Sequence, residues 1–223
     1  MRVVLFGATG MIGQGVLREC LLDPAVTAVL TVGRSPTGKQ HAKLREISHP
    51  DLTDLTAIQD DLRGYDACFF CLGVSSAGMS QDAYRRVTYD YTMAAARVFA
   101  AQDPDATFVY VSGAGTDSTE QGRSMWARVK GKTENDVLAL LPNAYMFRPG
   151  YIQPMHGIKS RTRMYRALYV VAVPLYPVLR RLFPKAVTTT EAIGRAMVNV
   201  AAKGAPAKVL NPNDINTAAG AGG

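Results

Sequence analysis

The sequence predicts an α/β protein built on a doubly wound parallel sheet, with residues 1–215 in a single domain. Three observations carry this prediction. Strand-like and helix-like segments alternate along the chain. Several strand-like segments are continuous apolar runs, as in a parallel sheet that helices cover on both faces. A glycine-rich turn joins the first strand to the first helix, and 223 residues suit one domain of this kind.

The N-terminal half alternates strongly between the two patterns. Residues 2–6 (RVVLF) are apolar and β-branched, whereas the apolar residues of 11–22 recur at helical spacing. The same criteria predict strands at 28–32, 44–47 and 67–72, and helices at 54–62 and 81–101.

The C-terminal half continues this order and then changes character. It predicts a strand at 107–111, a helix at 124–141 and a strand at 144–147. The following region, 151–187, is rich in proline and apolar residues, and we expect it to form a small substrate-covering region. Next come the capping signature Thr188-Thr189-Thr190-Glu191 with a helix to about residue 202, a short strand near 208–210, and a flexible tail at 216–223 that offers little to bury.

The turn Gly7-Ala8-Thr9-Gly10-Met11-Ile12-Gly13 lies between the first strand and the first helix. Glycines there permit a tight turn, close approach of backbone N–H groups to phosphate, and close packing of helix on strand. In this context the motif predicts a Rossmann dinucleotide-binding domain. The residues expected to bind the pyrophosphate of NAD(P) are Gly7, Thr9, Gly10, Met11, Ile12 and Gly13.

The end of the second strand reads Val32-Gly33-Arg34-Ser35 and contains no acidic residue for the ribose 2′-hydroxyl of NAD. Arginine pairs well with a 2′-phosphate. We therefore predict NADP as the cofactor, bound through Arg34 and Ser35, with NAD as the less favoured choice. The alternative for Arg34 is a solvated surface side chain.

Four motifs recur in the order of a known family: GATGMIG at 7–13, CLG at 71–73, YVSGAG at 110–115 and RPGYI at 148–152. On these motifs the chain resembles the extended and atypical short-chain dehydrogenase/reductase superfamily, and within it the small Tat-interacting-protein-like and NmrA-like members. The resemblance implies that Asp51 and Leu52 flank the adenine. It also implies that two further segments pass near the pyrophosphate and nicotinamide, namely Cys71, Leu72 and Gly73, and Pro149, Gly150 and Tyr151.

The same resemblance implies a catalytic serine, tyrosine and lysine. Ser112 and Lys130 match, with Lys130 also expected at the nicotinamide ribose, but Trp126 stands in the position of the tyrosine. Indole does not ionise usefully, so it cannot replace the phenol in proton transfer. Two hypotheses remain: an NADP-dependent oxidoreductase or epimerase-like enzyme with another acid (Tyr151, Lys130 or His156), or a non-catalytic NADPH-binding regulator or sensor. There is also an alternative to a catalytic role for these two residues. Ser112 would then be a plain hydroxyl at the end of a strand, and Lys130 a surface lysine.

The remaining features are less specific. Cys68 and Cys71 fit a buried strand better than a zinc or redox site, and we predict no metal. The odd cysteine count favours a cytoplasmic location. The net charge of +7 is compatible with an anionic ligand, an acidic partner or a membrane surface and does not select among them, but scattered Lys and Arg residues argue against nucleic acid. We expect a small-molecule substrate, or none for a regulator, and a candidate peripheral membrane contact at 165–183.

Overall fold

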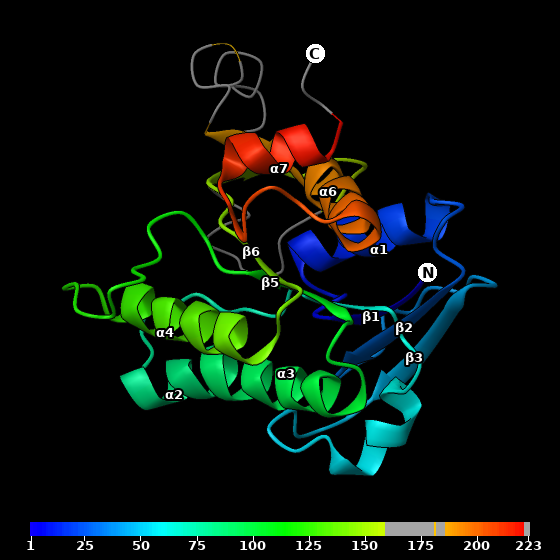
Figure 1. Ribbon diagram of the computed structural model, residues 1–223, viewed down its shortest axis with the longest axis horizontal. Helices are drawn as coiled ribbons and strands as arrows, with labels where there is room; N and C mark the ends of the chain where they lie inside the picture. The colour runs from blue at the N-terminus through cyan, green and yellow to red at the C-terminus, as the bar shows by residue number, and fades with distance from the viewer. Residues whose placement is uncertain (159–180, 182–185, 221–223) are drawn as a thin grey trace.

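The computed structural model describes residues 1–158, 181 and 186–220. Its centre is a parallel seven-stranded sheet in the order β3-β2-β1-β4-β5-β6-β9, which confirms the predicted doubly wound α/β fold (Figure 1). The strands are β1 (Arg2–Phe6), β2 (Ala28–Gly33), β3 (Leu44–Ser48), β4 (Ala67–Phe70), β5 (Thr107–Val111), β6 (Ala144–Phe147) and β9 (Val209–Leu210).

Helices cover both faces of the sheet (Figure 1). One face carries α1 (Met11–Leu22), α6 (Thr190–Lys203) and α7 (Pro212–Ala218), and the other carries η1 (Thr56–Leu62), α2 (Gln81–Arg85), α3 (Tyr91–Gln102) and α4 (Met125–Leu140). Because alternate side chains of each strand point to opposite faces, the strands feed two separate apolar cores. Val3 and Leu5 belong to the core under α1 and α6, whereas Val4 and Phe6 belong to the core under α3.

A second, two-stranded sheet pairs β7 (Tyr151–Gln153) with β8 (Val187–Thr189) in parallel. The sequence analysis did not predict these strands. Helix α7 holds them in place, because the Asn216 side chain donates to the Val187 carbonyl oxygen at 2.8 Å and accepts from the Thr188 hydroxyl at 2.7 Å. The expected flexible tail at 216–223 therefore begins inside a helix. Capping at Asn211 and burial of Ile215 stabilise that helix.

Several element boundaries differ from the prediction. The helix expected at 81–101 contains a π-helical turn, η2 (Arg86–Asp90), between α2 and α3. The helix expected at 54–62 is instead a 3₁₀ helix, η1 (Thr56–Leu62). Strand β4 ends at Phe70 rather than at residue 72, because the backbone at Leu72 turns to lie against Gly7. The cap of α6 is Thr189, whose hydroxyl accepts from the Ala192 N–H at 2.9 Å, one residue later than predicted.

Two predictions fall wholly or largely on residues outside the described part of the chain. The candidate membrane contact at 165–183 is one, and most of the substrate-covering region at 151–187 is the other. Among the described residues, none of the helices has the length and apolar character that crossing a membrane requires.

Candidate dinucleotide site and the end of strand β5

The turn between β1 and α1 is held by close backbone contacts. Gly7 has a left-handed φ of 81°, and a Cβ atom there would lie 2.6 Å from the Leu72 nitrogen. A Cβ on Gly13 would lie 2.0 Å from the Gly7 carbonyl oxygen. Both positions therefore exclude any side chain. The sequence placed these glycines correctly in a tight strand-turn-helix unit.

Gly10 has a different part in this turn. It is the N-cap of α1 and brings no side chain to cap the first-turn N–H groups. A Cβ there would meet only the Gly7 carbonyl oxygen, at 3.3 Å. The positive end of the helix dipole is thus left uncapped at the carboxyl-terminal edge of the sheet, where an anion is stabilised. The expected pyrophosphate residues Thr9, Met11 and Ile12 belong to the same turn and first helical residues. These features fit a dinucleotide pyrophosphate.

The loop after β2 presents Arg34 and Ser35 to solvent. A residue that the sequence analysis did not identify holds this loop: the Glu46 carboxylate accepts from the Thr37 N–H at 2.8 Å and the Thr31 hydroxyl at 3.0 Å. Partial burial acts to raise the pKa of Glu46, but these hydrogen bonds hold it below its usual value. Glu46 is therefore ionised, and its carboxylate stabilises this loop.

The expected adenine-side residues occupy two different environments. Leu52 is buried, whereas Asp51 accepts from the Thr53 hydroxyl at 2.7 Å and lies 3.5 Å from the Arg86 guanidinium. The hydrogen bonds from Thr53 and the charge of Arg86 lower the pKa of Asp51.

After β4, Cys71 is half-buried with its sulfur 4.0 Å from that of Met197, while Gly73 has open space at the position of a Cβ. Cys71 is a free thiol whose pKa is raised by burial.

Ser112 follows β5 and is 5% exposed. Its hydroxyl donates to the Glu134 carboxylate, and the Phe147 carbonyl oxygen lies 3.1 Å away as a second acceptor. The side chain thus links β5 to α4 and β6. The Ser112 hydroxyl is thus hydrogen-bonded within the protein, and both the strand-end role and the catalytic role that the resemblance implies stay predictions.

Lys130 and Trp126 lie one helical turn apart on α4 and both reach the loop after β5. The Lys130 ammonium donates to the Ser112 carbonyl oxygen. Burial lowers the pKa of Lys130 to about 8, although the charge of Glu134 acts in the opposite direction. The indole of Trp126 lies against Gly115, where a Cβ atom would be 3.2 Å from Cη2. Lys130 is therefore a titratable group at the sheet edge, and Trp126 supplies a flat apolar surface beside it.

A buried ion pair joins this region to the loop after β6. The Arg148 Nε atom lies 3.0 and 3.1 Å from the two Glu134 carboxylate oxygens, and its Nη2 also donates to Glu134. Glu134 is 1% exposed and the Arg148 side chain 17%. The sequence analysis did not identify this pair. The sequence contains two features that could have indicated it: Glu134 lies one turn after Lys130 on the same predicted helix, and Arg148 begins the RPGYI motif.

The loop that Arg148 opens carries the remaining predicted cofactor residues. The Pro149 carbonyl oxygen accepts from the Ala114 N–H at 2.9 Å, so this loop lies beside the one after β5. A Cβ on Gly150 would be 2.6 Å from the Ala186 carbonyl oxygen. The Tyr151 hydroxyl donates to the Gln153 side chain at 2.8 Å. The structure thus brings together the loops after β1, β5 and β6 at one edge of the sheet.

His156, an alternative candidate acid, contacts helix α6. Its Nε2 is 2.6 Å from a Glu191 oxygen on α6. The hydrogen bond from His156 lowers the pKa of Glu191. Across the described ranges, no group of three or more His, Cys, Asp and Glu side chains is arranged to hold a metal ion.

Comparison with known proteins identifies relatives by sequence. The model of the NAD dependent epimerase/dehydratase family matches residues 3–132. Protein FMP52-2, mitochondrial, of Scheffersomyces stipitis is 27% identical over 215 residues, which cover 93% of this chain and 90% of that protein. Protein HTATIP2 of Rattus norvegicus is 26% identical over 153 residues, covering 67% of this chain and 62% of that protein. These relatives confirm the resemblance described from the motifs.

Solved structures support the fold. The enzyme WbmF of Bordetella bronchiseptica, solved in complex with NAD⁺, superposes with a TM-score of 0.69 at 18% identity, covering 100% of this chain and 79% of WbmF. The UDP-N-acetylglucosamine 4-epimerase of Methanobrevibacter ruminantium M1 gives a TM-score of 0.70 at 15% identity, covering 93% and 74% of the two chains.

The predicted cytoplasmic location requires correction. Several FMP52 relatives are named mitochondrial proteins, among them those of Scheffersomyces stipitis, Meyerozyma guilliermondii and Emericella nidulans. The odd cysteine count does not support that location specifically, because free cysteines indicate a reducing environment rather than a particular compartment.

Proposed function

The chain belongs to the NAD dependent epimerase/dehydratase family, and from this premise we propose that it binds NADP(H) in preference to NAD(H). The observation that supports this choice is the loop after β2, where Arg34 and Ser35 are exposed. The nearby carboxylate of Glu46 is engaged by Thr31 and Thr37. A 2′-phosphate would meet a guanidinium there, whereas a bare ribose would find no free carboxylate among these residues.

Calorimetric titration with both cofactors tests this proposal. Wild type should bind NADPH more tightly than NADH, and Arg34→Ala should reduce NADPH affinity by about ten- to a hundredfold, since a charged hydrogen bond contributes about 1.5–3 kcal/mol. NADH affinity should stay unchanged. Arg63→Ala, an exposed arginine paired with Asp60 beside η1, is the matched control. Equal affinities for both cofactors in wild type would overturn the preference.

For activity, we propose an oxidoreductase or epimerase-like reaction on a small molecule, with Lys130 as the proton-transferring group. Bound NADP(H) would supply the hydride chemistry. Lys130 would hold the proton at its Nζ atom, which the Ser112 carbonyl oxygen orients at the end of β5. Trp126 and the adjoining loop would exclude water on one side, and the Glu134–Arg148 pair would fix the loops after β5 and β6.

A second candidate is a regulator that binds NADPH without turnover. Two observations favour it: Trp126 has no ionisable group, and the Ser112 hydroxyl is buried against Glu134. NADPH oxidation across a panel of carbonyl compounds separates the two candidates. Turnover that disappears in Lys130→Met supports the enzyme. Binding without turnover, followed through fluorescence of the single tryptophan, supports the regulator.

A further inference from the structure

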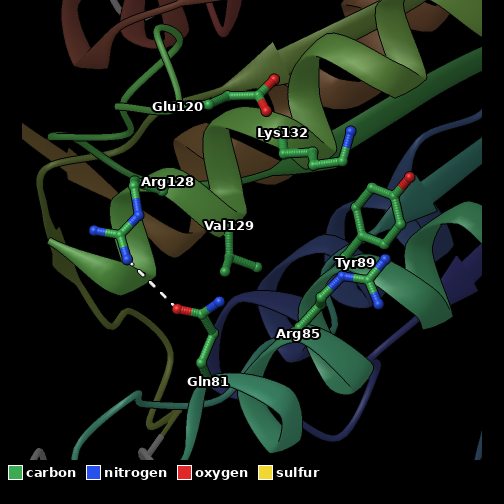
Figure 2. A pocket seen from close by; sticks show the side chains of 7 residues that line it. All are labelled: Gln81, Arg85, Tyr89, Glu120, Arg128, Val129 and Lys132. Carbon is green, nitrogen blue, oxygen red and sulfur yellow. Dashed lines mark hydrogen bonds between the residues drawn. The ribbon is translucent and has the colours of Figure 1, made fainter. Parts of the chain in front are cut away.

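A small cavity of about 170 Å³ lies between the α2–η2 segment and α4 (Figure 2). Arg128 and Lys132 of α4 line it. These two residues are half a turn around the helix from Trp126 and Lys130, which face the end of β5. The cavity is therefore separate from the surface on which the dinucleotide is proposed to bind.

The cavity wall carries three cations around an apolar floor. Arg85, Arg128 and Lys132 surround Val129 and the ring of Tyr89 (Figure 2). The remaining lining residues are Gln81 and Glu120. Since three cationic side chains share the wall with one carboxylate, the cavity favours an anion.

The two arginines have N–H donors to spare. The Arg85 guanidinium is stacked 4.7 Å from the centre of the Tyr89 ring and lies 3.4 Å from Asp90. It makes no hydrogen bond to any other described residue. Nη1 of Arg128 donates to the carbonyl oxygens of Gly122 and Arg123, whereas among the described residues the only acceptor for Nη2 is the Gln81 amide oxygen at 3.4 Å (Figure 2).

The acidic groups around the cavity already have hydrogen-bond partners, and for Asp136 these partners are two of the lining residues. The Glu120 carboxylate accepts from the Asn135 side chain at 2.8 Å. Asp136 accepts from Lys132 at 3.0 Å and also from the Tyr89 hydroxyl. The hydrogen bond to Asp136 raises the pKa of Lys132, so this side chain is an ammonium ion at neutral pH.

We propose that this cavity binds the phosphate group of a small phosphorylated molecule, as a second anion site distinct from the dinucleotide site. Two guanidinium groups on different elements suit the oxygens of a phosphate, which arginine recognises through paired N–H donors. The volume is below the roughly 300–1,000 Å³ typical of pockets for drug-sized ligands, so it suits one phosphate group with a short organic part. Tyr89 and Val129 provide the surface for that part.

Calorimetric titration with glycerol 3-phosphate and with inorganic phosphate, on protein saturated with NADPH, tests the proposal. We expect binding to wild type and a loss of about tenfold or more in Arg85→Gln. Arg85→Gln is the preferred variant because the Arg85 guanidinium pairs with Asp90 and stacks on Tyr89 within its own helical segment, whereas Arg128 holds the loop at Gly122. Arg63→Gln, which removes an equal charge on an exposed side chain, should bind as wild type does.

A second arm separates this site from the cofactor site and from lipid. Arg34→Ala should leave phosphate binding unchanged. Vesicles containing phosphatidic acid should cosediment with the protein only if a lipid supplies the phosphate. Unchanged affinity in Arg85→Gln, binding abolished by Arg34→Ala or by NADPH, or no heat with either phosphate probe would each overturn the proposal.

Discussion

The turn between β1 and α1 and the segment from β5 to α4 meet at the same edge of the sheet, but they are built by opposite means. The turn depends on missing side chains, because Gly7 and Gly13 leave room for backbone atoms to touch. The β5–α4 segment depends on buried charged side chains, with Glu134 bound to both Ser112 and Arg148. A substitution that adds atoms should therefore damage the first region, and one that removes charge should damage the second.

The largest effect should come from Gly13→Val. Its Cβ would lie 2.0 Å from the Gly7 carbonyl oxygen, and backbone on both sides prevents relief. We expect a loss of more than about 4 kcal/mol in the free energy of unfolding, measured by urea denaturation. Gly10→Ala is the contrasting variant, because its Cβ meets only one atom at 3.3 Å. It should stay folded but bind NADPH more weakly. A stable Gly13→Val protein would show that the turn is looser than described.

Glu134→Gln tests the charged region. Breaking a buried ion pair on one side leaves the other charge without its partner, so we expect a loss of about 3–5 kcal/mol in the free energy of unfolding. Arg45→Gln breaks the exposed pair with Asp61 and should cost only about 0–1 kcal/mol. Similar losses in the two variants would mean that the Glu134–Arg148 pair is solvated and does not fix the loops.

The difference between the regions also explains what the sequence could predict. The contact between Gly13 and Gly7 is local in sequence, so glycine spacing predicted the turn, and the alternation of strand-like and helix-like segments predicted the parallel sheet. The partners of Ser112 are 22 and 35 residues away, and no local pattern reveals that its hydroxyl is used by Glu134. The sequence did not predict the π-helical turn at Arg86–Asp90, because a single extra residue hardly changes helical periodicity.

Lys130 gives the charged region a pH dependence. Its pKa is about 8 in the folded protein and about 10.4 in an unfolded chain. Between these values the unfolded state binds more protons, so the free energy of unfolding should rise with pH. We expect a rise of about 1–2 kcal/mol, allowing for partial exposure, in wild type relative to Lys130→Met. Denaturation of both proteins at pH 7, 9 and 10.5 measures it. If the difference in the free energy of unfolding between the two proteins did not change with pH, the pKa of Lys130 would be the same in the folded and unfolded states.

The smallest change, and the most informative for function, is Trp126→Tyr. The indole lies against Gly115 one turn before Lys130, so a tyrosine there places a phenol within the same loop contact. The neighbouring Lys130 ammonium lowers the pKa of a phenol there, which makes the phenol a better proton donor to the oxygen of a carbonyl substrate during hydride transfer from NADPH. We expect NADPH-dependent reduction of small carbonyl compounds to be faster in Trp126→Tyr than in wild type, with little change in NADPH affinity. The measurement is NADPH oxidation followed by absorbance.

Two control variants decide what such a gain would mean. Trp126→Phe opens the same space without a hydroxyl, and Trp126→Tyr with Lys130→Met keeps the phenol without the neighbouring ammonium. Both should be inactive if proton transfer is what the natural sequence lacks. Equal activity in Trp126→Phe would instead show that the indole had only blocked access to the cofactor. Lys130 or another group would then already supply the proton, and the β5–α4 segment would be a catalytic site closed by Trp126 rather than one that has lost its acid.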